Sequence, residues 1–202
     1  MAALALLGGC AVGNKHAYHD ANATTTTRTD KSVAVASLDG RPYILAGKSS
    51  PDFVGMQRGG FGNPFDVLTA SGRPLSSEFS SAIKAALVRN GANVIVVETQ
   101  PAGDNKAAVT SLVATQRDRL LLLDISEWVS DTFQNTGLGY TLRLAVADSN
   151  GKELAQKTIK ADLNLGGSVI NPPGHAKEVI PPAFRQAVEQ LLNSPEITAA
   201  LK

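Results

Sequence analysis

The stretch Arg119-Leu-Leu-Leu-Leu-Asp-Ile-Ser-Glu-Trp-Val129 is the strongest strand signal in this sequence, because it opens with four leucines and stays rich in apolar residues. Two further strands are predicted downstream, at residues 139–147 and 152–163. Between them, Asp148-Ser-Asn-Gly151 has the composition of a hairpin turn. The second half of the chain therefore predicts a three-stranded antiparallel meander.

Two strands and three helices are predicted around this meander. Ser32–Leu38 has a short strand pattern, and residues 93–98 form an apolar run typical of a buried strand. Amphipathic spacing and helix-end signals predict helices at residues 74–90, 104–115 and 182–193. The order is strand, helix, strand, helix, three strands, helix. It predicts a single α+β domain with a mixed or antiparallel sheet and helices packed on one face.

Composition excludes several classes of protein. The 202 residues are 43% hydrophobic and 18% charged, which indicates one globular domain rather than a disordered chain. A net charge of +1 and an aromatic content of 5% argue against nucleic acid as a partner. We therefore expect a globular protein that does not bind nucleic acid.

Two short motifs resemble cofactor-binding motifs but lack residues that such motifs need. Gly47-Lys48-Ser49 is not a phosphate-binding loop, because Pro42 stands where that motif needs glycine and Pro51 disfavours a following helix. His16 and His19 are too few to form a zinc site by themselves. We expect no nucleotide, no metal, no other cofactor and no catalytic residue.

The single cysteine, Cys10, follows an apolar run and the small residues Gly8 and Gly9. Leu7-Gly8-Gly9-Cys10 resembles the lipobox of bacterial lipoproteins. The resemblance implies that a lipid is attached to Cys10 and that residues 1–9, the remnant of a signal peptide, are removed. Ala11 is not the Asp associated with retention at the inner membrane. The expected location is thus the outer membrane, on the periplasmic side.

Two segments lack a regular apolar period. Residues 10–31, which contain the lipidated Cys10 and the run Thr24-Thr25-Thr26-Thr27, are expected to be a flexible tether, with the domain spanning 32–202. Residues 39–72 are dense in Gly and Pro and are expected to be a long loop. Their many apolar side chains either fold back into the core or present an adhesive surface. We expect Phe65 to be buried near the first helix and Phe61 to be exposed.

Three other residues are candidates for a partner-binding surface. Asp39 and Arg41 lie where the first strand ends, as either a structural ion pair or a contact to a ligand or partner. Trp128 shares a strand face with Asp124, which predicts a half-exposed position where an aromatic residue can anchor a partner. Packing of Trp128 in the core is the alternative interpretation, and it is the one we favour. Together with Phe61 and Phe65, these residues form the tentative partner-binding set.

The whole pattern resembles the YajG-like group of uncharacterised outer-membrane lipoproteins. The likeness is mostly architectural and is carried by the lipobox, Asp39-x-Arg41, Gly47, Asn90-Gly91-Ala92, Asn150-Gly151 and Ser194-Pro195-Glu196-Ile197. It implies the fold and the location, and the group has no assigned activity.

Two hypotheses for function follow. The first is a non-enzymatic envelope lipoprotein that docks onto another envelope protein or onto its own copies. The alternative is a binding module for a small envelope ligand, a glycan or a lipid, held between residues 39–72 and the sheet. A deep, partly apolar cavity favours the binding module, whereas a flat exposed apolar patch favours the adaptor.

Overall fold

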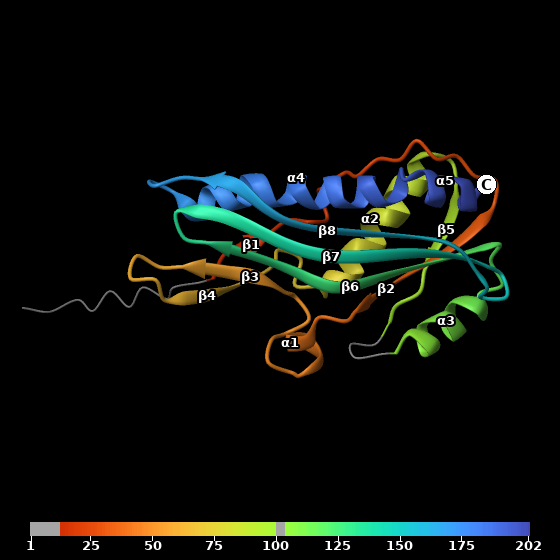
Figure 1. Cartoon of the computed structure of the whole chain (residues 1–202), viewed down its shortest axis with the longest axis horizontal. Helices are drawn as coiled ribbons and strands as arrows, with labels where there is room; N and C mark the ends of the chain where they lie inside the picture. The colour runs from red at the N-terminus through yellow and green to blue at the C-terminus, as the bar shows by residue number, and fades with distance from the viewer. Residues whose placement is uncertain (1–12, 100–103) are drawn as a thin grey trace, which may run out of the picture.

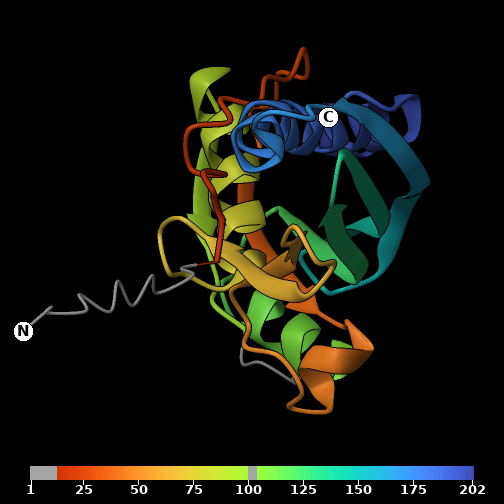
Figure 2. The same cartoon turned by 90° about the vertical axis from the view of Figure 1, so that its left-hand side faces the viewer.

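The computed structural model describes residues 13–99 and 104–202, so Cys10, the lipobox and the expected signal-peptide remnant 1–9 lie outside the described residues. The described chain forms one α+β domain around a single mixed sheet of eight strands (Figure 1). The sheet is curled, and β8 turns up towards the long helix α4 (Figure 2). The predicted fold class is confirmed.

The predicted meander forms the larger part of the sheet. β6 (Arg119–Thr132), β7 (Asn135–Asp148) and β8 (Glu153–Gly167) pair antiparallel along almost their whole length. Asp148 closes the β7–β8 turn, because its carboxylate accepts the backbone N–H groups of Asn150 (2.9 Å) and Lys152 (3.0 Å). The turn residues identified from the sequence therefore determine the register of this hairpin.

The other edge of β6 is long enough to pair with two strands in succession. Its first half pairs in parallel with β2 (Ser32–Asp39), which in turn pairs with β5 (Asn93–Val96). Its second half pairs in parallel with β3 (Phe53–Arg58). β3 forms a hairpin with β4 (Pro64–Thr69), and the short β1 (Lys15–His16) pairs with β4.

Helices cover both faces of the sheet rather than one. The main core lies under three of them, α2 (Leu75–Arg89), α4 (Pro172–Leu192) and α5 (Pro195–Leu201). Another helix, α3 (Asn105–Val113), packs on the opposite face, over small residues of β2 and leucines of β6. The expected packing on one face therefore holds for α2, α4 and α5, and α3 is the exception.

The expected tether differs from the structure. From Asn14 onward, this segment lies along β4, α2 and α4, and it buries Tyr18, His16 and Ala23 almost completely. The threonine run contributes hydrogen bonds: the N–H of Thr26 donates to Oδ1 of Asn193, 2.8 Å away. The described part of residues 10–31 is thus an integral part of the domain.

The expected loop at residues 39–72 also differs from the structure. It contains the one-turn helix α1 (Pro42–Leu45) and the whole β3–β4 hairpin, and only short turns join them. Glycines obscure the strand pattern. Gly55, for example, lies so close to Ser130 of β6 that a Cβ atom would be about 2.1 Å from the serine hydroxyl.

The last predicted helix begins ten residues earlier than expected. Pro181 and Pro182 suggested a helix start, but both lie inside α4. Buried Ala176 and Ile180 before them and Phe184 after them pack into the core and keep one continuous helix. Among the described residues, no helix is long and apolar enough to cross a bilayer.

Candidate functional site

Asp39 and Arg41 form a buried structural ion pair. Arg41 Nη2 lies 2.7 Å from Asp39 Oδ2, and its Nη1 donates to the carbonyl of Phe53 at 2.6 Å. Burial disfavours the charged guanidinium, yet the hydrogen bonds to Asp39 raise the pKa of Arg41. Arg41 is fully buried, so the pair joins the end of β2 to β3 and is not exposed to a partner.

Trp128 lies in the core, with none of its surface exposed. Its Nε1 donates to the Tyr18 hydroxyl at 3.0 Å, and the Tyr140 ring stacks on it. The reason is a β-bulge in β6 between Ile125 and Glu127, which shifts the alternation of side chains by one residue. Trp128 therefore faces the main core, as in the alternative interpretation of the sequence.

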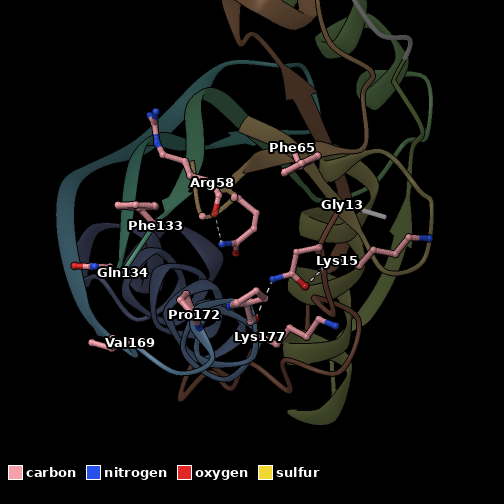
Figure 3. A pocket seen from close by; sticks show the side chains of 14 residues that line it. Gly13, Lys15, Arg58, Phe65, Phe133, Gln134, Val169, Pro172 and Lys177 are labelled. Atoms are coloured by element: carbon pink, nitrogen blue, oxygen red, sulfur yellow. Dashed lines mark hydrogen bonds between the residues drawn. The ribbon is translucent and has the colours of Figure 1, made fainter. Parts of the chain in front are cut away.

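A cavity of about 800 Å³ opens at one end of the curled sheet, within the size range of small-molecule sites. Figure 3 shows its lining side chains around the opening. They come from four separate parts of the chain: residues 13–15, the β3–β4 hairpin, the β6–β7 turn, and the start of α4 with the loop before it. This opening is called the cavity mouth below.

Two close contacts fix the N-terminal segment at the cavity mouth. Gly13 lies against the carbonyl of Asp66 in β4, where a Cβ atom would overlap the carbonyl oxygen. Asn14 is buried, and its Nδ2 donates to the carbonyl of Pro173 at 3.0 Å. The segment therefore links the hairpin to the start of α4 and completes the wall of the cavity.

The cavity wall is mainly apolar, and its charges are basic. Phe65, Phe133, Val169 and two prolines of α4 contribute apolar surface. Among the described residues that line the cavity, the charged ones are Lys15, Arg58 and Lys177. Arg58 is paired with Asp131 at 2.5 Å, whereas Lys15 and Lys177 are exposed and make no ion pair with a described residue. Such a wall suits an apolar ligand with an anionic group.

A polar floor lies beneath the cavity. Gln57 is 8% exposed; its Nε2 donates to the carbonyl of Thr132 at 3.2 Å, and its Oε1 has no partner among the described residues. His16 lies close by, and burial, with the charge of Lys177 adding to it, lowers the pKa of His16 to about 4. His16 is therefore neutral near pH 7, and Gln57 offers a buried acceptor at the cavity.

Ser130 and His16 are the nearest approach to a nucleophile and its base. The Ser130 hydroxyl is 3.5 Å from Nε2 of His16, and it lies 3.3 Å from the carbonyl of Val54, to which it donates. Both residues are buried and neither lines the cavity, so this contact packs β1 against β6. Among the described residues, no group of three or more His, Cys, Asp or Glu side chains could hold a metal.

The two phenylalanines of the hairpin have different positions. Phe61 is fully exposed at the tip between β3 and β4, as expected. Phe65 is half-buried in β4 and lines the cavity, whereas the sequence predicted burial near the first helix. Of the tentative set, Phe61 and Phe65 are thus at the cavity mouth, whereas Asp39, Arg41 and Trp128 are internal.

Sequence reasoning missed most of the cavity. Lys15 and Asn14 lie in the presumed tether, and Lys177 precedes the expected start of the last helix. One signal was available: Val169-Ile170 is an apolar pair between Gly167-Ser168 and Asn171-Pro172, in a stretch otherwise typical of a solvated loop.

Comparison with known proteins shows a shared fold only. No protein-family model and no curated protein matches this sequence. The crystal structure of protein XCC0632 from Xanthomonas campestris, of the family DUF330, has a TM-score of 0.55 at 13% identity, over 87% of this chain and 92% of that chain. A crystal structure of an uncharacterised protein has a TM-score of 0.47 at 10% identity, over 87% and 94% of the two chains. The PelC dodecamer from Paraburkholderia phytofirmans has a TM-score of 0.37 at 13% identity, over 83% and 93%.

The likeness to XCC0632 supports the fold described above. At this identity it says nothing about ligand or partner, and the resemblance to the YajG-like group stays a prediction.

Proposed function

We propose that this protein is a non-enzymatic lipoprotein of the bacterial outer membrane, anchored through Cys10 and facing the periplasm. Its cavity holds an amphipathic envelope lipid with an anionic headgroup. The observation that carries this proposal is the cavity of about 800 Å³ with an apolar wall and the unpaired basic residues Lys15 and Lys177 at its rim.

The wall composition favours a lipid over a glycan. Sugars are bound mainly through many hydrogen bonds, whereas most of the accessible wall is apolar surface from Phe65, Phe133, Val169 and prolines. An acyl chain against these side chains gains hydrophobic burial. The anionic headgroup then lies near Lys15 and Lys177, where charge-assisted hydrogen bonds are available. The buried Gln57 Oε1 accepts a hydrogen bond from a hydroxyl of the headgroup or glycerol.

The adaptor hypothesis has less support at the docking residues that were proposed for it from the sequence. Asp39, Arg41 and Trp128, three of its five residues, are buried. Of the other two, Phe65 lines the cavity, and Phe61 is fully exposed next to Gly60 at the edge of the cavity. The cavity is partly apolar, and this part of the criterion set from the sequence supports the ligand-binding module.

Binding of a monomeric lipid tests this function. The protein from position 10 onward, with Cys10→Ser so that no lipid is attached, is mixed with dihexanoyl phosphatidylglycerol below its micelle concentration, and thermal unfolding is followed. A ligand at 100 times its dissociation constant adds about 2.7 kcal/mol to the free energy of unfolding. We expect clear stabilisation by this lipid and much less by the zwitterionic dihexanoyl phosphatidylcholine.

Charge reversal at the rim provides the matched control. Lys15→Glu combined with Lys177→Glu should abolish the stabilisation, because both substitutions place a negative charge beside the headgroup. Lys106→Glu, on exposed α3 at the other end of the molecule, should leave it unchanged. No stabilisation of the parent, or equal stabilisation of the parent and the rim variant, would contradict the proposal.

A further inference from the structure

The most exposed apolar side chains gather at the cavity mouth. Phe61 is 102% exposed, Ile170 97% and Val169 82%, whereas the other large exposed apolar residues are between 43% and 49% exposed. Phe61 lies on the β3–β4 tip, and Val169 and Ile170 lie on the loop between β8 and α4. Both loops project from the same end of the molecule (Figure 1). Phe133, 43% exposed on the β6–β7 turn, completes a face of four apolar residues, the mouth face.

Basic residues lie around the same opening. Lys15, Arg58 and Lys177 line the cavity together with Phe133 and Val169 (Figure 3). The exposed ends of Lys15 and Lys177 have no acidic partner among the described residues. Apolar side chains beside unpaired cations are typical of a surface that rests in the headgroup region of an anionic bilayer. Soluble surfaces seldom hold such side chains fully in water at several adjacent loop tips.

The chain enters the domain at this same face. Gly13, the first described residue, lines the cavity, and Cys10 precedes it by three residues. Three residues of chain span at most about 11 Å. A lipid on Cys10 would therefore hold the mouth face, rather than any other surface, within reach of the bilayer.

We propose that the mouth face of Phe61, Phe133, Val169 and Ile170 docks onto the surface of a bilayer that contains anionic lipid. The apolar tips enter the interface, and the basic side chains contact lipid phosphates. In this orientation the cavity opens onto the membrane, so a lipid passes between bilayer and cavity without crossing water. This last consequence and the role of the lipid on Cys10 rest on the proposed function, whereas the docking itself is tested without the anchor.

Vesicle binding tests the docking. The Cys10→Ser protein from position 10 onward contains every described residue, and its partition between solution and sedimented vesicles is measured. We expect binding to vesicles that contain phosphatidylglycerol, weaker binding to phosphatidylcholine alone, and weakening by salt. Phe61→Ser with Ile170→Ser should lower the partition constant by at least about tenfold. Burial of each apolar side chain in the interface contributes a free energy that corresponds to roughly a tenfold change in this constant.

The control substitutes equally apolar residues elsewhere. Val88→Ser with Leu154→Ser changes two exposed apolar residues away from the mouth face and should leave vesicle binding unchanged. Neither Phe61 nor Ile170 lines the cavity, so the Phe61/Ile170 variant should still bind the monomeric lipid. Loss of vesicle binding with monomer binding retained supports the docking face. Failure of the parent to bind vesicles, or equal binding by both double variants, would overturn it, whatever the monomer assay shows.

Discussion

The segments on either side of β2 are both without a regular apolar period, yet both are packed, and by different means. Residues 13–31 place single side chains, such as that of Tyr18, in the main core and are held further by polar contacts, such as Asn90 Nδ2 donating to the carbonyl of Thr27 at 2.6 Å. Residues 39–72 form a two-stranded ladder fixed to the sheet by the buried Arg41. The comparison teaches that absence of periodicity predicts absence of a helix or a regular strand, but not absence of packing.

The largest expected effect concerns the second segment. Arg41→Ala leaves the carboxylate of Asp39 buried without its partner and removes donors from the carbonyls of Phe53 and Trp128. Breaking a buried ion pair in this way costs about 3–5 kcal/mol of the free energy of unfolding. Denaturant unfolding measures the loss.

Arg58→Ala is the matched control for Arg41→Ala. It breaks the ion pair between Arg58 of β3 and Asp131 of β6, whose side chains are 39% and 42% exposed, so the loss of stability should be far smaller. Equal losses in the two variants would mean that the buried pair does not fix the segment to the sheet.

The second prediction concerns residues 13–31, whose contribution to the free energy of unfolding depends on pH through His16. In the folded protein the pKa of His16 is about 4, because the ring is buried, against 6.5 in an unfolded chain. Between these values the unfolded chain binds a proton that the folded chain does not, so the free energy of unfolding falls as pH falls from about 6.5 to about 4. The total loss is roughly 3 kcal/mol, and it is complete below that range.

His16→Gln removes this contribution and should flatten the dependence, measured as the difference in unfolding free energy between about pH 7 and about pH 4. A slope that does not change in His16→Gln would show that the segment containing His16 is not packed in solution as in the structure.

The periodicity of apolar residues predicted those strands and helices that bury one continuous apolar face. The meander and α2 were found because apolar residues repeat with the period of a strand or a helix over many residues. The strand-face argument for a half-exposed Trp128 failed because the bulge after Ile125 changes the face of every residue beyond it, and such a bulge has no mark in the sequence. The start of α4 was missed because two internal prolines resemble a start signal.

The cavity was beyond sequence reasoning for a different reason. Its walls come from four segments that only the curled sheet brings together, and each contributes one or two unremarkable residues, such as Lys15 and Lys177. What the sequence could predict was the exposure of Phe61, because glycines on both sides leave its side chain no neighbours. A site built from distant segments is thus predictable only at those residues whose exposure follows from their neighbours in the sequence.

The smallest expected effect separates the two phenylalanines within the hairpin. Phe61 is fully exposed, so Phe61→Ala should change the free energy of unfolding by no more than about 0.5 kcal/mol. Phe65 is half-buried against Gly59 and the cavity wall, so Phe65→Ala should cost clearly more, but less than the roughly 3–5 kcal/mol of a fully buried aromatic residue. Denaturant unfolding of both variants, with the parent alongside, measures the difference. A large loss for Phe61→Ala would mean that the tip folds back onto the domain, and the mouth face would then lack its most exposed residue.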